Sequence, residues 1–168
     1  MDLETIYIVR HGIAENSARS GLDADRRLSD VGIDRTDRAA RGMKIIGVRP
    51  DTILFSPLRR AEETARIVSR ILGDIPARIC PPLAPGFNFD ELSEEFFKPP
   101  KPSKILVVGH QPDLGMLASR LATGDPGAMQ LPFRKAATAC FEVYGSPQLL
   151  RGTLQWFMTP HQLRGVRE

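Results

Sequence analysis

The chain has 168 residues, a length typical of one domain that buries about two-thirds of its unfolded surface. Hydrophobic residues make up 42% and charged residues 26%, and the formal net charge is only +3. This charge, without any run of Lys and Arg, argues against a nucleic-acid partner but is compatible with an anionic substrate. No apolar run approaches the roughly 20 residues of a membrane-spanning helix, so we expect a single domain over 1–168 with no membrane partner.

The two cysteines give information about the cellular compartment of the protein and about a possible metal cofactor. Cys80 and Cys140 have no metal-ligand spacing, which favours structural thiols in a reduced protein. The acidic residues Asp2 and Glu4 and the short apolar run after them are unlike a signal peptide. We therefore expect a cytoplasmic protein with neither a metal ion nor another cofactor.

The first half of the chain alternates between predicted strands and helices. The apolar run 6–9 predicts a strand buried on both faces, and a polar loop follows over 15–27. Ser29 or Asp30 is the expected N-cap of a helix that reaches about residue 46. Its predicted apolar face consists of Ile33, Ala39, Ala40, Met43 and Ile46.

The middle of the chain continues this alternation. A strand is predicted over 52–55 and a helix over 58–72, with Ala61, Ala65, Val68 and Leu72 at helical spacing. A short strand over 77–80 precedes a short amphipathic helix within 83–97. The proline-rich stretch 98–102 is expected to be a solvated spacer.

The last third supplies three more strands and one more helix. The run 105–108 predicts a strand, and a helix opened by Pro112 extends to about residue 122. Strands over 137–144 and 153–158 are expected to pair antiparallel. The alternation predicts an α/β fold: a three-layer α/β/α sandwich around a mostly parallel sheet with an antiparallel edge strand.

Polar side chains follow three of the predicted strands at their carboxyl ends. They are Arg10 and His11 after the first strand, Ser56, Arg59 and Arg60 after the second, and Gly109 and His110 after the strand at 105–108. Carboxyl ends of neighbouring parallel strands share one edge of a sheet, where ligands bind. Two of the three histidines occupy such positions, which favours a functional site there.

These residue types favour phosphoryl transfer over metal chemistry. Two imidazoles and several arginines without neighbouring carboxylates are a poor donor set for a divalent metal. Guanidinium groups match phosphate oxygens, and a neutral imidazole can attack phosphorus. Fixed positive charge also stabilises the group in transfer. The residues therefore predict metal-independent phosphoryl transfer through a phosphohistidine.

Three sequence blocks carry a family resemblance. The run 10–12, Arg-His-Gly, resembles the signature of the histidine phosphatase superfamily, which has the phosphoglycerate-mutase-like fold. The run 56–65 resembles the second block of that family, and 108–110 resembles the third. The blocks occur in the family order and span most of the chain.

The resemblance implies roles for individual residues. His11 corresponds to the phosphorylated nucleophile, and Arg10, Arg60 and His110 correspond to the rest of the phosphate pocket. Arg60 is the match because it directly precedes the Ala-Glu pair, whereas Arg59 is expected to be solvated.

Within the superfamily, the chain most resembles the small bacterial phosphohistidine phosphatases. The shared features are its compact length, the segment 26–32 and the Trp-x-x-x-Pro pattern at 156–160. The resemblance implies a phosphate contact for Arg26, although a loop arginine in water is an equal alternative. Ser56 is expected either to close its turn or to touch phosphate. The remaining candidate substrate-binding residues are Gly12 and Gly109.

An acid is missing where larger family members place one. The corresponding stretch here, 81–88, contains no Asp or Glu. The four acids between 90 and 95 are expected on a solvated helix face, and Asp113 is expected to cap the helix after His110. An alkoxide leaving group needs a general acid more than an imidazole does. The missing acid therefore favours phosphohistidine or another phosphoramidate as substrate. The resemblance implies that a protein of the histidine-phosphotransfer type carries the phosphohistidine.

Two alternatives remain open at this point. A small-molecule phosphomonoesterase would bring an acid from 90–95 into the pocket and hydrolyse a sugar or nucleotide phosphate. A non-catalytic phosphate- or phosphohistidine-binding module would bind the anion without turnover, although it would not need an attacking imidazole at position 11.

Overall fold

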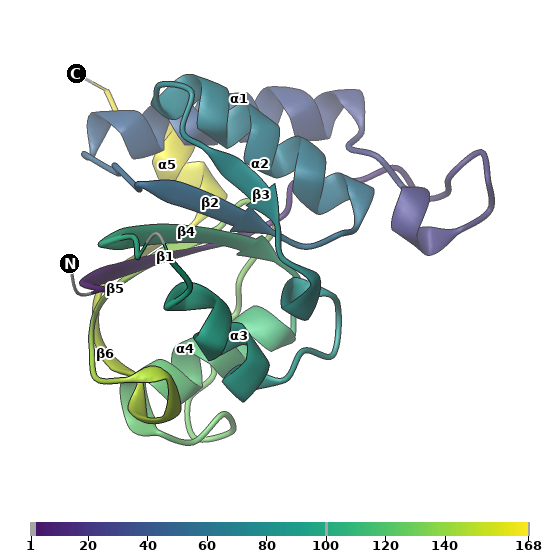
Figure 1. The fold of residues 1–168 in the computed structure, drawn as a ribbon. Coiled ribbons are helices and arrows are strands. Elements are labelled where there is room, and N and C mark those ends of the chain that lie inside the picture. The colour runs from purple at the N-terminus through teal and green to yellow at the C-terminus, as the bar shows by residue number, and fades with distance from the viewer. Residues whose placement is uncertain (1–2, 100, 168) are drawn as a thin grey trace.

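The computed structural model describes residues 3–99 and 101–167, which form a six-stranded sheet between two layers of helices (Figure 1). The strands are β1 (Thr5–Arg10), β2 (Thr52–Phe55), β3 (Ala77–Ile79), β4 (Lys104–Gly109), β5 (Thr138–Tyr144) and β6 (Arg151–Met158). The helices are α1 (Asp30–Ile45), α2 (Arg59–Leu72), α3 (Phe89–Phe96), α4 (Asp113–Thr123) and α5 (Pro160–Gly165). The short 3-10 turns are η1 (Asp23–Asp25), η2 (Pro81–Leu83) and η3 (Pro147–Leu149).

The sheet is mixed, with the strand order β3-β2-β4-β1-β5-β6. β1, β2, β3 and β4 pair in parallel, whereas β5 runs antiparallel to both β1 and β6. The predicted mostly parallel sheet with antiparallel pairing towards one edge is confirmed. The register aligns Val9 with Thr138 and Thr138 with Met158, so the ends of β1 and β6 share one edge with the start of β5.

Helices cover both faces of the sheet, which confirms the three-layer sandwich. Figure 1 shows α1, α2 and α5 on one face and α3 and α4 on the other. Each face has its own buried cluster: Met43, Val68 and Leu163 belong to the first, and Phe96 and Leu117 to the second. Burying apolar side chains on both faces accounts for the continuous apolar runs of the central strands.

The apolar face predicted for α1 is partly wrong. Ile33 and Ile46 are 45% and 37% exposed, whereas Ala39, Ala40 and Met43 are buried as predicted. The helix instead packs through small residues that allow close backbone contact. A Cβ on Gly42 would lie only 2.0 Å from the carbonyl oxygen of Leu163 in α5. With α1 held in this position, Ile33 and Ile46 are partly exposed, whereas Met43 is buried.

The helix α5 was not predicted from the sequence. Its signal is a capping box, in which the hydroxyl of Thr159 accepts the backbone N–H of Gln162 while the side chain of Gln162 accepts that of Thr159. A Pro at the first helical position supports the same assignment. The helix packs on α1 and extends the layer on that face of the sheet.

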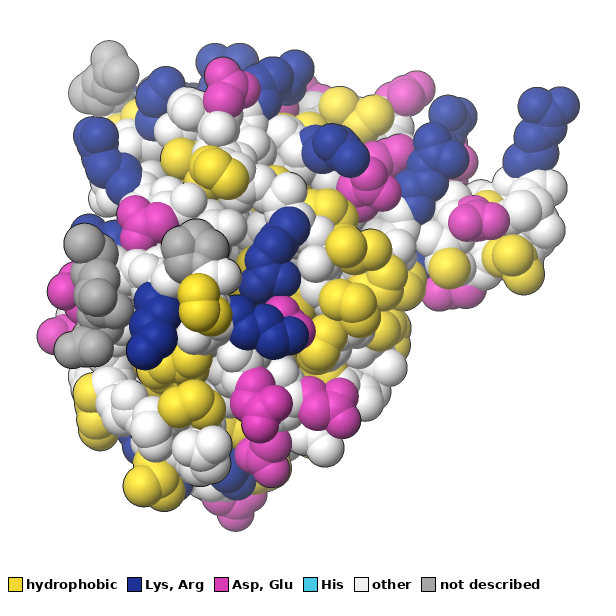
Figure 2. All heavy atoms as spheres, viewed as in Figure 1, with side chains coloured by type: hydrophobic (Ala, Val, Ile, Leu, Met, Phe, Trp, Pro, Cys, Tyr) yellow, Lys and Arg dark blue, Asp and Glu magenta, His cyan; other side chains and the backbone are white. Residues whose placement is uncertain are grey.

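The remaining expectations concern the surface and the thiols. Figure 2 shows basic and acidic side chains interspersed over the face viewed, so neither sign of charge forms a continuous patch there. No helix among the described residues is long and apolar enough to cross a membrane. Cys80 and Cys140 are buried free thiols, and burial raises the pKa of each to about 11. In the spacer 98–102, Pro100 lies outside the described residues.

Candidate active site

The two histidines at strand ends lie next to each other at one edge of the sheet, with their rings tilted by 53°. β4 pairs with both β1 and β2, and its Val108 aligns with Val9 and with Phe55. The residues that follow these three strand ends are thereby brought together. The ring centroids of His11 and His110 are 5.1 Å apart, and each residue is only 5% exposed.

His11 is held as a neutral ring with a defined proton position. Its Nδ1 lies 2.7 Å from the carbonyl oxygen of Gly12, which can only accept, so Nδ1 carries the proton. Burial, followed by the charges of His110, Arg60 and Arg10, lowers the pKa of His11 to about 3, against the opposing effect of the Gly12 bond. At neutral pH the Nε2 lone pair is therefore available to attack an electrophile.

A buried hydroxyl links the His11 turn to the start of α2. The backbone N–H of Gly12 donates to Thr64 Oγ1 over 3.0 Å, and Thr64 Oγ1 donates to the carbonyl oxygen of Arg60 over 2.7 Å. Thr64 has no exposed surface, and Arg60 is only 7% exposed. The position of the His11 ring is thus coupled to the helix turn that carries Arg60. Thr64 was missed as a site residue, although its spacing of four from Arg60 places it one helical turn away.

Arg10 contributes a cation from the end of β1. Its Nη1 donates to the carbonyl oxygen of Phe133 over 2.8 Å, which fixes the guanidinium plane. Its buried Nε has no hydrogen-bond partner among the described residues. Burial lowers the pKa of Arg10, but a guanidinium remains charged near neutral pH. Arg10 therefore keeps donors available for an anion.

Ser56 contacts His110. Its Oγ lies 2.7 Å from His110 Nε2 and also accepts the backbone N–H of Leu58. Burial, followed by the charges of Arg60 and Arg10, lowers the pKa of His110 to about 4. His110 Nδ1 is buried and lacks a partner among the described residues, and such atoms are uncommon without a ligand or water.

The segment 15–27, which we call the arm, extends away from the body of the molecule at the right of Figures 1 and 2. Its Asp23 bridges two arginines of the site. The Asp23 carboxylate accepts from Arg60 Nη2 over 3.1 Å and from Arg26 Nη1 over 2.9 Å, and the Asp23 carbonyl accepts from Arg60 Nη1 over 2.9 Å. Arg26 also donates to the carbonyl of Glu15, so its side chain, 25% exposed, is not free in water.

Asp23 is an acid that the sequence analysis missed. The hydrogen bond from Arg60, with the charges of Arg60 and Arg26, holds the pKa of the Asp23 carboxyl below its usual range. The group is thus an ionised partner for the arginines and a poor proton donor near neutral pH. No sequence signal links it to Arg60, because the two residues are 37 positions apart.

Lys135 is a cation near the site that the sequence analysis also missed. It lies in the loop before β5, at the edge of the sheet that carries His11. Burial, followed by the charges of Arg10, Arg26 and Arg60, lowers its pKa. The antiparallel direction of β5 brings this loop to the site, and only the order of the strands reveals it.

The two candidate glycines take part through their backbones. The carbonyl of Gly109 accepts the N–H of His11 over 3.1 Å. The carbonyl of Gly12 accepts from His11 Nδ1, and the N–H of Gly12 donates to Thr64. In this structure they support the nucleophile's turn. Arg59, 54% exposed, pairs with Glu63 on the outside of α2, in line with the expectation of a solvated residue.

The remaining acids lie elsewhere. Asp90, Glu91 and Glu94 are exposed on α3 as expected, whereas Glu95 is not: its side chain is only 11% exposed and pairs with Arg78. The expectation that Asp113 caps α4 was wrong: its carboxylate accepts the backbone N–H of Gly86 over 2.7 Å, which holds the loop before α3. The side chain makes no capping bond because that backbone donor satisfies it.

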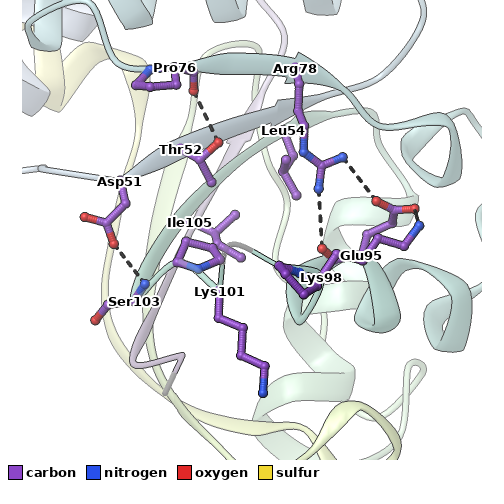
Figure 3. Close-up of a pocket in the computed structure, with 12 residues that line it drawn as sticks. Asp51, Thr52, Leu54, Pro76, Arg78, Glu95, Lys98, Lys101, Ser103 and Ile105 are labelled. Atoms are coloured by element: carbon purple, nitrogen blue, oxygen red, sulfur yellow. Dashed lines mark hydrogen bonds and ion pairs between the residues drawn. The ribbon is translucent and has the colours of Figure 1, made fainter. Parts of the chain in front are cut away.

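A hollow of about 490 Å³ lies at the opposite edge of the sheet, beside the starts of β2 and β4 (Figure 3). Its Arg78 pairs with Glu95 over 3.1 Å, and Lys98 contacts the same carboxylate. Asp51 accepts the backbone N–H of Ser103. Arg78 and Lys98 thus share one carboxylate, and all of these groups are far from the strand ends that carry the histidines. The described residues also contain no cluster of three or more His, Cys, Asp or Glu that would hold a metal ion.

Comparison with known proteins agrees with this geometry. The family model for the histidine phosphatase superfamily (branch 1) matches residues 6–85. The phosphohistidine phosphatase SixA of Escherichia coli is 30% identical over 163 residues, which cover 95% of this chain and 96% of that protein. The chain belongs to the histidine phosphatase superfamily.

One further relative and one solved structure are also similar to the chain. An uncharacterized protein of Picosynechococcus is 37% identical over 125 residues, covering 73% of this chain and 75% of that protein. The structure of the protein histidine phosphatase SixA complexed with tungstate superposes with a TM-score of 0.82 at 29% identity, covering 95% of this chain and 99% of that one. The family and the two SixA matches support a phosphatase.

Proposed function

We propose that the protein is a metal-independent phosphohistidine phosphatase that acts on a phosphorylated protein through a phospho-His11 intermediate. The observation that carries the proposal is the state of His11. Its ring is neutral, its Nδ1 proton is fixed by Gly12, and its free Nε2 lies among Arg10, Arg60 and His110. Such a nitrogen is a nucleophile set among donors for phosphate oxygens.

In the first step, the Nε2 lone pair of His11 forms a bond to phosphorus. The bond between phosphorus and the substrate imidazole breaks, and its electron pair stays on the imidazole nitrogen, which takes a proton from solvent. Arg10 and Arg60 hold the oxygens of the group in transfer and stabilise its charge. If the hydroxyl of Ser56 donates to Nε2 of His110, the Nδ1–H of that neutral ring is a further donor.

In the second step, water attacks the phosphorus of phospho-His11. The bond to Nε2 breaks, the ring regains its lone pair, and inorganic phosphate leaves with the protons of the water shared between phosphate and solvent. The Nδ1–H bond to Gly12 keeps the ring in one orientation through both steps. Arg26 acts on the same anion from the arm, with Asp23 as its ionised partner.

The choice of phosphohistidine rests on the leaving group. Asp23, the carboxylate that contacts the site arginines, has a lowered pKa and is a poor general acid. A substrate whose leaving group requires little protonation fits such a site. SixA, named as a phosphohistidine phosphatase, and its tungstate complex support phosphohistidine and an oxyanion as ligands. The cytoplasmic location expected from the free thiols stays a prediction.

The test is release of phosphate from a protein phosphorylated on histidine, measured with a metal chelator present. The wild type is compared with His11→Ala, whose folding is checked by circular dichroism. We expect release with the wild type alone. Equal release by both proteins would contradict the nucleophile. Rapid hydrolysis of a sugar or nucleotide phosphate, with none of phosphohistidine, would favour the small-molecule phosphomonoesterase.

A further inference from the structure

A hollow of about 460 Å³ lies at the same edge of the sheet as His11, between α1 and α5. Its walls come from the turn after β1, from α1, from the loop before β5 and from the start of α5. We call it the α1–α5 cleft and define it by its five basic residues, Arg35, Arg134, Lys135, His161 and Arg164. Among the described residues that line it, none is Asp or Glu.

The cations of the cleft differ from others on the same layer of helices. Arg38 and Arg41 of α1 and Arg66 and Arg70 of α2 each form an ion pair with an acid. Within the described part of the chain, no ion pair within 4.0 Å involves an arginine or lysine of the cleft. The cleft therefore concentrates positive charge with which the described acids form no ion pair.

Like charges are held close together in this hollow. Burial and then the charges of Arg35 and Arg38 lower the pKa of Arg164, with Asp34 opposing them weakly. Burial and then the charges of the site arginines likewise lower the pKa of Lys135. Clustered cations raise the local concentration of anions and are stabilised when an anion binds.

The cleft also contains a buried polar group without a partner. Thr36 lines it and is 1% exposed, and its Oγ1 has no hydrogen-bond partner among the described residues. A buried hydroxyl without a partner is unfavourable. The Thr36 hydroxyl therefore adds a polar group to a hollow whose basic residues supply many hydrogen-bond donors.

The cleft adjoins the turn that carries His11. Gly12, which accepts from His11, forms part of its wall, and the N–H of Ala136 lies 3.0 Å from the Arg10 carbonyl and 3.2 Å from that of His11. Lys135 belongs to the cleft and is also close enough to the site arginines to be affected by their charges. The cleft and the candidate site therefore share the turn after β1 and the loop before β5.

We propose that the α1–α5 cleft binds acidic side chains that flank the phosphohistidine of the substrate protein. The inference rests on the proposed function and specifies its substrate class. The basic residues lie on separate segments around the hollow, and the hollow is larger than one anionic group requires. Several carboxylates of a polypeptide fit this arrangement better than one ion does. Acidic side chains satisfy the unpaired cations while the phosphoryl group meets His11.

The test compares two double variants with equal loss of charge. Arg35→Gln/Arg164→Gln removes cations from the cleft, and Arg66→Gln/Arg70→Gln removes exposed cations from α2. The first readout is binding of an unphosphorylated Asp/Glu-rich peptide and of its Asn/Gln counterpart, by fluorescence anisotropy at low salt. The second is kcat/KM for phosphohistidine peptides with the same two flanks and for free phosphohistidine.

We expect the cleft variant to lose about three- to tenfold in affinity and in kcat/KM for the acidic peptide only. The control variant keeps both values, and the difference shrinks at high salt. Equal loss in both variants, or no preference of the wild type for the acidic peptide, would overturn the inference. Inhibition by added pyrophosphate is measured as well. If the cleft variant loses this inhibition but binds and hydrolyses both peptides like the wild type, the inference is overturned, and the cleft instead binds a second phosphate group.

Failure of the proposed function gives a different pattern. No hydrolysis of any phosphohistidine substrate, free phosphohistidine included, would reject the phosphatase. The binding readout would still decide whether the cleft selects acidic peptide. Normal hydrolysis of free phosphohistidine without any effect of the flanks would reject the cleft alone.

Discussion

The candidate site has two halves that are built differently. His11, Thr64 and Arg60 form a buried half, in which hydrogen bonds between the β1 turn and α2 fix each group. Asp23 and Arg26 form a half on the arm, where Asp23 is 63% exposed and its contacts are ion pairs near solvent. Buried bonds are costly to break, whereas exposed ion pairs contribute little. We infer that the buried half determines the rate and that the arm tunes affinity.

The largest effect is expected at the nucleophile. His11→Asn keeps a side-chain N–H that can donate to Gly12 but removes Nε2, so turnover should fall by at least roughly 10³-fold. Steady-state phosphate release measures this, with circular dichroism to confirm folding. Near-normal turnover in the folded variant would show that another group attacks phosphorus.

The next effect concerns the link between the nucleophile turn and α2. Thr64→Val leaves the N–H of Gly12 without its acceptor, which should cost about 1–3 kcal/mol in the free energy of unfolding. Displacement of the His11 turn should also lower kcat by about ten- to a hundredfold. Denaturant titration measures the free energy of unfolding, and steady-state kinetics measure kcat. Thr64→Ser keeps the hydroxyl and should therefore retain most of the wild-type stability and kcat. Equal activity of the Val and Ser variants would show that the His11 turn and α2 are not coupled through Thr64.

A third prediction concerns pH. The pKa values of folded His11 and His110, about 3 and about 4, lie below the unfolded value of 6.5, so the unfolded chain binds more protons between these limits. Stability should therefore fall as pH decreases from 6.5 towards 4, by on the order of 3 kcal/mol between pH 7 and pH 5.

Denaturant titrations across this range test the assignment. His11→Asn should make the dependence shallower because one buried imidazole is removed. His161→Asn, at an exposed position, is the matched control. A slope that His11→Asn leaves unchanged would show that other groups cause it.

The smallest effects are expected on the arm. Asp23→Asn removes a negative charge beside Arg60 and should tighten binding of inorganic phosphate by about two- to fivefold, and Arg26→Gln should weaken it by a similar factor. Competitive inhibition by phosphate gives both values. Changes in kcat should stay within about twofold for each variant. A large fall in kcat for Arg26→Gln would place Arg26 with the rate-determining half.

The sequence predicted the site residues at the strand ends better than those on loops, for a physical reason. Arg10, His11 and His110 directly follow apolar runs, and parallel pairing alone brings such positions together. Local patterns also predicted most helix and strand ranges. Asp23 and Lys135 were missed because their contacts depend on a loop conformation and on the place of β5 in the sheet. The short helix α5 was missed although its capping box is visible in the sequence.

The central claim, a covalent phosphoryl group on His11, can be tested most directly by trapping the intermediate. The enzyme is mixed with histidine-phosphorylated protein, quenched within milliseconds under alkaline conditions that preserve phosphohistidine, and digested for mass spectrometry. We predict a phosphoryl group on the peptide that contains His11 in the wild type, and none on the corresponding peptide of His11→Asn. Phosphate release without any phosphorylated His11 peptide, at a sensitivity shown with a phosphohistidine standard, would contradict the mechanism.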